Sequence, residues 1–136
     1  MKILFDDQIF LLQKFGGISR YFTELIYELN KTSDHEAICP IVQTENIHYN
    51  EKINKRISFL DRLKLIASFK FTETSINRYA LRQNRKNIVN ALKKGDFDLF
   101  VPTYYDPYFL PYLGNKPFLL NVYDMIHELY PAYFTE

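Results

Sequence analysis

The sequence contains no tryptophan and a single cysteine among its 136 residues. One cysteine excludes an internal disulfide, and Cys39 lies in an apolar run where we expect a buried thiol without a redox partner. No apolar run approaches the roughly 20 residues of a membrane-spanning helix. Asp6 and Asp7 interrupt the first apolar stretch, which does not fit a secretory signal peptide. These features predict a cytoplasmic protein.

The chain also lacks a strong charge imbalance. Its 17 basic and 16 acidic residues give a formal net charge of +1, which excludes the basic composition typical of nucleic-acid binders. The basic residues concentrate between positions 52 and 94. The length and the 47% hydrophobic content suit one domain, 1–136, with a genuine core.

Short apolar runs alternate with amphipathic helical patterns. The sequence predicts strands at 3–5, 37–42, 98–101 and 118–122, and helices at 18–30, 59–71 and 75–94. Ser19 is the expected N-cap of the first helix, Gly95 is the expected stop after Lys94, and 44–58 is expected to be loop. Strands that alternate with helices favour an α/β fold with a Rossmann-like parallel sheet and flanking helices.

A glycine pair, Gly16–Gly17, separates the first strand from the first helix. Glycine lets a ligand approach the backbone closely, and the N–H groups at a helix start favour negative charge. The pair therefore indicates a binding site for a phosphate or diphosphate, while a simple turn before the helix is the alternative interpretation.

Ligands of parallel α/β sheets bind beyond the carboxyl ends of the strands. Polar side chains follow three of the predicted strands at that edge. They are Asp6 and Asp7, Thr103 to Asp106, and Tyr123, Asp124 and His127. We therefore expect a site at this edge of the sheet.

Three segments in this order resemble the N-terminal part of retaining family-4 glycosyltransferases. They are FDDQIF with FGGISRYF at 5–22, DFDLF with YYDP at 96–107, and PFLLNVYDMIHELYP at 117–131. The resemblance implies the GT-B architecture, in which two Rossmann-like domains enclose the active site. This chain would be the acceptor-side domain, without the C-terminal domain that holds most of the donor.

The resemblance also implies a function. The complete enzyme would transfer a sugar from a nucleotide-sugar donor to a saccharide or lipid-linked acceptor in surface polysaccharide biosynthesis, and the isolated domain would be inactive. No cofactor and no metal are expected. A free-standing α/β ligand-binding or regulatory domain without catalysis is the alternative.

Residue roles follow from the matched motifs. The donor diphosphate would be contacted by Gly16, Gly17 and Arg20. The acceptor would be bound by Tyr104, Tyr105, Asp106 and Tyr123. The catalytic side chains would be Asp124 and His127.

One position departs from the family pattern. Tyr123 stands where many relatives have histidine, and a tyrosine with a reference pKa of about 10 is not a base at neutral pH. The role of a catalytic base then falls to Asp124 or His127. Alternatively, no side-chain base is needed, because in the usual retaining mechanism the donor phosphate takes the acceptor proton.

A basic helical face is a further candidate site. It consists of Arg78, Arg82, Arg85 and Lys86. A solvated surface is one interpretation, and peripheral contact with anionic lipid at the inner face of the plasma membrane is the other.

Overall fold

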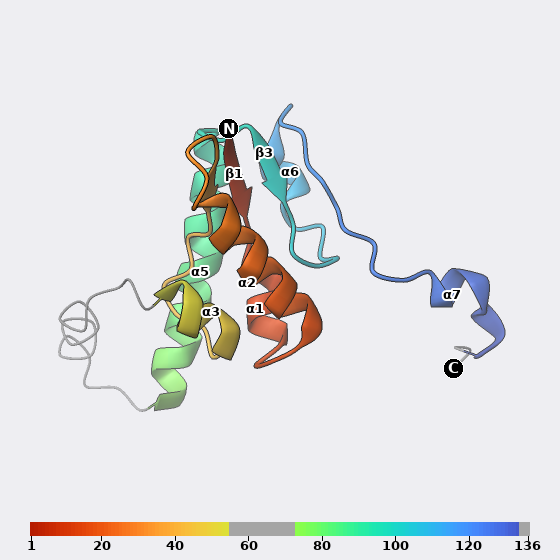
Figure 1. Cartoon of the computed structure of the whole chain (residues 1–136). Coiled ribbons are helices and arrows are strands. Elements are labelled where there is room, and N and C mark those ends of the chain that lie inside the picture. Colours follow the sequence, from red (N-terminus) through yellow and green to blue (C-terminus); the bar gives the residue numbers. More distant parts are fainter. Residues whose placement is uncertain (55–72, 134–136) are drawn as a thin grey trace.

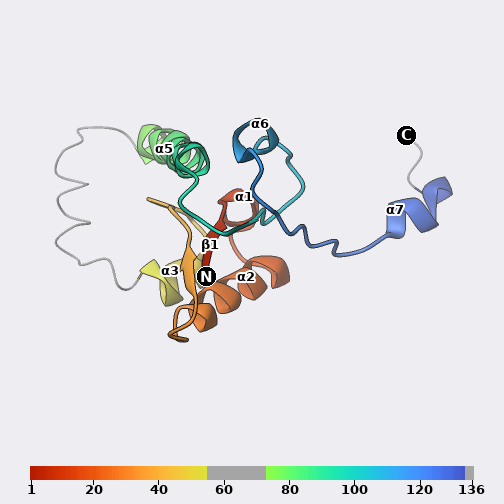
Figure 2. The ribbon, with the colours of Figure 1, turned by 90° about the horizontal axis from the view of Figure 1, so that it is seen from above.

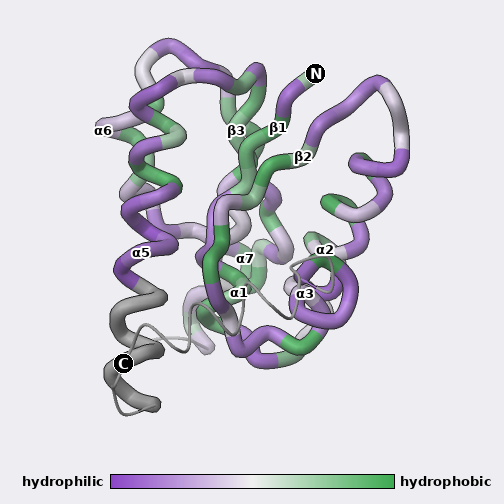
Figure 3. Tube along the Cα trace, turned by 90° about the vertical axis from the view of Figure 1, so that its left-hand side faces the viewer, coloured by the Kyte–Doolittle hydropathy of each residue, from purple (hydrophilic) through white to green (hydrophobic). Residues whose placement is uncertain are grey.

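The computed structural model describes residues 1–54 and 73–133. Three parallel strands form its sheet, in the order β2-β1-β3. They are β1 (Lys2–Phe5), β2 (Glu36–Ile38) and β3 (Leu99–Val101). Figure 1 shows the sheet with its helices, and Figure 3 shows that the strands are largely hydrophobic. The α/β fold with a parallel sheet is therefore confirmed.

Helices cover both faces of the sheet. The longer ones are α2 (Gly17–Leu29) and α5 (Glu73–Lys94), which lie on opposite sides of β1 in Figure 2. The shorter ones are α1 (Gln8–Leu12), α3 (Ile47–Lys52), α6 (Leu110–Leu113) and α7 (Ile126–Leu129), followed by the 3-10 turn η2 (Pro131–Tyr133). None of the helices in the described ranges is long and apolar enough to cross a membrane.

Alternation along β1 divides the core into two clusters, because successive strand side chains point to opposite faces. Ile3 and Phe5 pack with Phe22 and Ile26 of α2. Leu4 belongs to the cluster on the other face, which includes Ile88 and Leu92 of α5, Phe100 of β3 and Leu113 of α6. Both faces of the strand are buried, as in a doubly covered parallel sheet.

Several predicted boundaries differ from the structure. The expected loop after β1 contains α1, and the expected loop at 44–58 contains α3. Gly16, not Ser19, is the N-cap of α2. Gly95 ends α5 with a φ of 68°, as predicted for a helix-stopping glycine. The helix predicted at 59–71 lies outside the described residues.

The strand predicted at 118–122 is reduced to one bridge, between Phe100 and Phe118. The Leu119 N–H donates to the Phe100 carbonyl at 2.9 Å, and the Phe100 N–H donates to the Pro117 carbonyl at 3.0 Å. Beyond this contact the chain leaves the sheet and runs to α7, away from the body in Figures 1 and 2. Residues 120–123 lie opposite the start of α2.

Candidate functional site

A groove of about 600 Å³ lies between the start of α2 and the segment that follows the Phe118 bridge. Its volume is within the range of small-molecule sites, and it is a shallow groove that is largely open to solvent. The lining residues are Gly17, Ile18 and Tyr21 from α2, and Leu120, Asn121, Val122 and Tyr123 from the facing segment. The groove thus brings together Gly17, which is predicted to contact the donor diphosphate, and Tyr123, which is predicted to bind the acceptor.

The two glycines at the start of α2 have different surroundings. Gly16 is extended, with a φ of 167°, and a Cβ there would lie 2.4 Å from Oε1 of Gln13. That oxygen accepts the Ser19 N–H at 3.1 Å, so Gln13 caps the first turn of the helix. A Cβ on Gly17 would meet nothing within 4 Å. Gly16 therefore has a packing role, while Gly17 leaves the groove open.

Three tyrosines form the wall of the site next to the groove. The rings of Tyr104 and Tyr123 stack with centroids 6.3 Å apart, and Tyr105 lies 4.8 Å from Tyr104 and 5.8 Å from Tyr123. The Tyr123 N–H donates to the Tyr105 hydroxyl at 3.0 Å. The loop after β3 and the segment after the bridge are thereby joined through aromatic contacts, as predicted from their place at one sheet edge.

The Tyr123 hydroxyl is committed to a structural contact. It donates to the Thr103 carbonyl at 3.0 Å. Burial, together with the neighbouring Tyr105 and Tyr21, raises the Tyr123 pKa above its ordinary value. Tyr123 therefore stays protonated at neutral pH and is not poised to take up a proton, so its contribution to the groove is its ring.

Arg20 and Asp124 are not among the residues that line this groove. Arg20 is exposed on the first turns of α2. Asp124 is exposed, and its Oδ1 accepts the Ile126 N–H at 3.3 Å at the start of α7. The side chain of His127 lies outside the described part of the structure. Asp124 therefore caps a turn in this structure.

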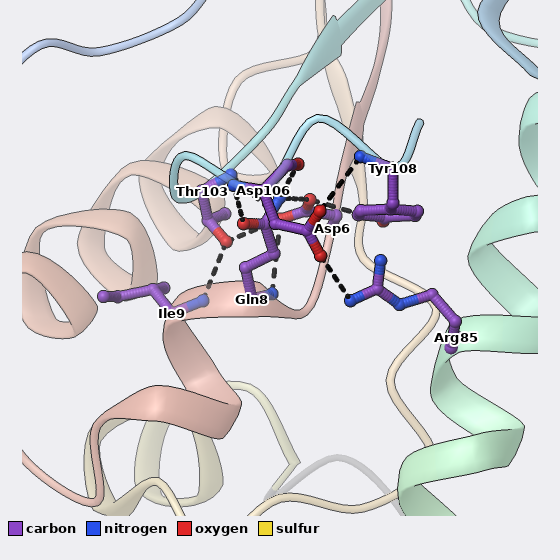
Figure 4. Close-up of polar contacts among 7 residues, drawn as sticks. All are labelled: Asp6, Gln8, Ile9, Arg85, Thr103, Asp106 and Tyr108. Atoms are coloured by element: carbon purple, nitrogen blue, oxygen red, sulfur yellow. Dashed lines mark hydrogen bonds and ion pairs between the residues drawn. The ribbon is translucent and has the colours of Figure 1, made fainter. Parts of the chain in front are cut away.

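A second polar cluster, the Asp6 cluster, joins the loops after β1 and β3 (Figure 4). The fully buried Asp6 carboxylate accepts bonds at Oδ1 from the Thr103 N–H at 2.8 Å and the Thr103 hydroxyl at 2.6 Å. Its Oδ2 accepts the Gln8 side-chain amide at 2.7 Å and the Tyr108 hydroxyl at 3.3 Å. Burial raises the Asp6 pKa, and the donors of Thr103 and Gln8 oppose that shift.

Asp106 belongs to this cluster rather than to the groove wall. Its backbone N–H donates to Gln8 Oε1 at 2.8 Å, and its carbonyl accepts Gln8 Nε2 at 3.0 Å. Its carboxylate lies 3.4 Å from the Arg85 guanidinium, which packs on the Tyr108 ring at 3.3 Å from the centroid. Arg85 thus anchors α5 to the loop after β3 (Figure 4).

Asp7 is the unusual member of this edge of the sheet. It is fully buried, and neither carboxylate oxygen has a hydrogen-bond partner in the structure. Burial raises its pKa to about 6; the Arg85 charge opposes this shift, and the Asp6 and Asp106 charges add to it. Buried carboxyl groups with such shifted pKa values are frequent at functional sites. The ionised form of such a group lowers the stability of the fold, because burial removes its solvation.

In the described ranges, no three His, Cys, Asp or Glu side chains are grouped as a metal site. Sequence reasoning missed Tyr21, Gln13, Gln8, Tyr108 and the pairing of Arg85. Tyr21 carries a usable signal, because it lies one turn after Gly17 on the same helix. The Gln8 and Tyr108 contacts carry none, since they depend on how two distant loops meet.

Comparison with known proteins finds no match: no family model, no curated protein and no solved structure is similar to this chain.

Proposed function

We propose that this chain is the acceptor-side half of a retaining glycosyltransferase of the GT-B type. The observation that carries the proposal is the groove that places Gly17, at the start of α2, opposite Tyr123. Those two positions belong to two of the three sequence segments that resemble family-4 glycosyltransferases. A parallel sheet with a glycine at the start of α2 is also compatible with such a domain.

The groove offers two kinds of contact to a nucleotide sugar and its acceptor. The start of the 13-residue α2 supplies the positive end of a helix dipole for a diphosphate. The Tyr21 and Tyr123 rings, and Asn121, supply flat faces and an amide for a sugar ring. Arg20 is exposed on the first turns of α2 and would add a positive charge near the same end of the helix.

The chemistry we propose needs no tyrosine base. The raised pKa of Tyr123 and its bond to Thr103 remove it from proton transfer. The acceptor proton passes to the donor phosphate on the same face of the sugar, and Asp124 or His127 orients the acceptor hydroxyl. The product therefore keeps the anomeric configuration of the donor.

A ligand-binding domain without catalysis is the second candidate. It is favoured by one observation: among the residues that the structure describes, the groove lining contains no carboxylate and no imidazole. Such a domain would bind the same ligand through α2 and the tyrosines and leave it unchanged.

A transfer assay separates the two candidates. The full-length product of the gene is incubated with a panel of UDP-, GDP- and dTDP-sugars and saccharide or lipid-linked acceptors. We expect acceptor-dependent release of the nucleoside diphosphate and a product with retained configuration by NMR. Binding of a sugar nucleotide without any release would support the second candidate, and an inverted product would contradict the retaining assignment.

A further inference from the structure

The exposed side of α5 carries a row of basic residues on the face of the sheet opposite α2 (Figure 2). Residues 82–94 include five basic and no acidic side chains. Arg82, Lys86, Asn90 and Lys93 are all exposed and recur at spacings of four, four and three, which places them on one side of the helix. Asn84, Ile88 and Leu92 lie on the other side and are buried.

The structure changes the membership of the basic face that the sequence predicts. Arg85 turns toward Asp106 and Tyr108 and takes no part in the exposed row. Lys94 lies 3.9 Å from Asp96, so part of its charge is compensated. Arg82, Lys86 and Lys93 remain as the basic row of α5, and the side chain of Arg78 lies outside the described part of the structure.

Apolar side chains lie beside this row. Helix α6 packs against α5, and Leu110 and Tyr112 are 52% and 38% exposed. The Lys93 ammonium lies 5.2 Å from the centre of the Tyr112 ring, which joins the two helices into one surface. Figure 3 shows the hydrophilic α5 next to α6.

We propose that this surface, Arg82, Lys86 and Lys93 with Leu110 and Tyr112, docks on an anionic lipid bilayer. Basic side chains are attracted to anionic headgroups, while exposed leucine and tyrosine side chains enter the boundary between headgroups and acyl chains. A nucleic acid fits less well, because it offers no apolar layer for Leu110 and Tyr112 and because the net charge of the chain is only +1. The groove opens beside α2, on the other side of the sheet, and stays accessible.

Vesicle binding tests this proposal with the chain as it is. Co-sedimentation is measured with phosphatidylcholine vesicles, with and without about one third phosphatidylglycerol, at about 0.1 M salt, where charges are screened beyond ~10 Å. We expect binding to the anionic vesicles only. Arg82→Gln with Lys86→Gln should weaken it about 25-fold, from about fivefold for each charge removed near the surface.

The control has the same net charge. Lys14→Gln with Lys31→Gln removes two exposed charges from the α2 side of the molecule and should leave vesicle binding unchanged. Leu110→Ser with Tyr112→Ser should weaken binding and remove the part that persists at high salt. Equal losses in the two double-glutamine variants, equal binding to vesicles without phosphatidylglycerol, or binding to a short DNA duplex in place of the vesicles would overturn the proposal.

Discussion

Asp6 and Asp7 are adjacent, both fully buried, and opposite in their hydrogen bonding. Asp6 is surrounded by donors from Thr103, Gln8 and Tyr108, whereas Asp7 has none. A buried carboxylate without donors loses the solvation that it has in the unfolded chain. The same substitution at the two positions should therefore change stability in opposite directions.

Asp7→Asn should stabilise the fold above about pH 6. The folded pKa of about 6 lies above the ordinary value of 3.8, so the folded chain binds the proton more tightly than the unfolded chain does. The ionised residue therefore lowers stability by an amount that grows from about pH 4 to pH 6 and is then constant, at most about 3 kcal/mol from 1.36 kcal/mol per pKa unit. Unfolding by urea at a series of pH values measures it.

The pH profile is the decisive part of that experiment. Below about pH 4 Asp7 is protonated in both states, and the variant should differ from the parent only by a constant cost that does not change with pH. The unpaired amide of the new asparagine reduces the gain but does not depend on pH. A difference that is the same at pH 4 and pH 8 would show that the Asp7 charge is not the cause.

Asp6→Asn should destabilise the fold, by about 1–3 kcal/mol for donors left unsatisfied. The new amide would turn its own N–H groups toward the Thr103 pair or toward Gln8 and Tyr108. The midpoint of urea unfolding checks it at pH 7, with Asp7→Asn as the matched control. Two variants that shift stability in the same direction would contradict the assignment of hydrogen bonds.

These residue roles are only partly readable from the sequence. The place of Asp6 and Thr103 at neighbouring strand ends follows from the strand pattern and the rule that ligand sites lie at that edge. Which of two adjacent aspartates meets the donors depends on the turn between β1 and α1, and no periodicity encodes that turn. Asp106, predicted to bind the acceptor, is instead held by Gln8 and Arg85. No periodicity in the sequence encodes this contact either, because it depends on how two distant loops meet.

At the scale of elements, the start of α2 shows how one side chain can replace a conventional cap. Gln13 reaches across Gly16 to accept the Ser19 N–H, and a Cβ on Gly16 would collide with it. The backbone at Gly16 is extended and open to other residues, so a side chain there would disturb the position of the Gln13 side chain and not the backbone conformation.

Gly16→Ala should cost about 0.5–2 kcal/mol, the usual value of a helix cap, because the new methyl group displaces Gln13. Gly17→Ala should be neutral or slightly stabilising, since its Cβ meets nothing. Thermal unfolding of both variants is compared with that of Gln13→Ala and of the Gln13→Ala/Gly16→Ala double variant. If the account is right, Gly16→Ala costs nothing further once Gln13 is removed, and full additivity would contradict it.

The elements differ in how well the sequence predicts them. The amphipathic pattern of α2 and the glycine stop of α5 are local, and both predictions are confirmed within two residues at the described ends. Helices α1 and α3 are short and were predicted as loops, because five or six residues do not establish a helical period. Residues 118–122 have the composition of a strand, but only Phe118 meets β3.

At the scale of the whole molecule, the sheet order explains where the groove lies. With β1 in the centre, the loops after β1 and β3 are neighbours, and the segment after Phe118 continues the same edge. The start of α2 and the tyrosines meet there, while the basic row of α5 lies on the other side of the sheet. The molecule thus presents two separate surfaces, the groove at the start of α2 and the basic row of α5.

Sugar transfer by the Gly17→Val variant tests directly whether the groove at the start of α2 holds the ligand. The measurement is sugar transfer by the full-length product of the gene, with thermal unfolding as the control for folding. Gly17 lines the groove and a side chain there meets no other group, so the variant should fold normally and lose on the order of a hundredfold in transfer rate as the ligand is displaced. The control variant, Ser33→Val, places the same valine side chain in the exposed turn after α2, and it should keep the parent rate. A folded Gly17→Val enzyme that transfers sugar as fast as the parent would contradict the account.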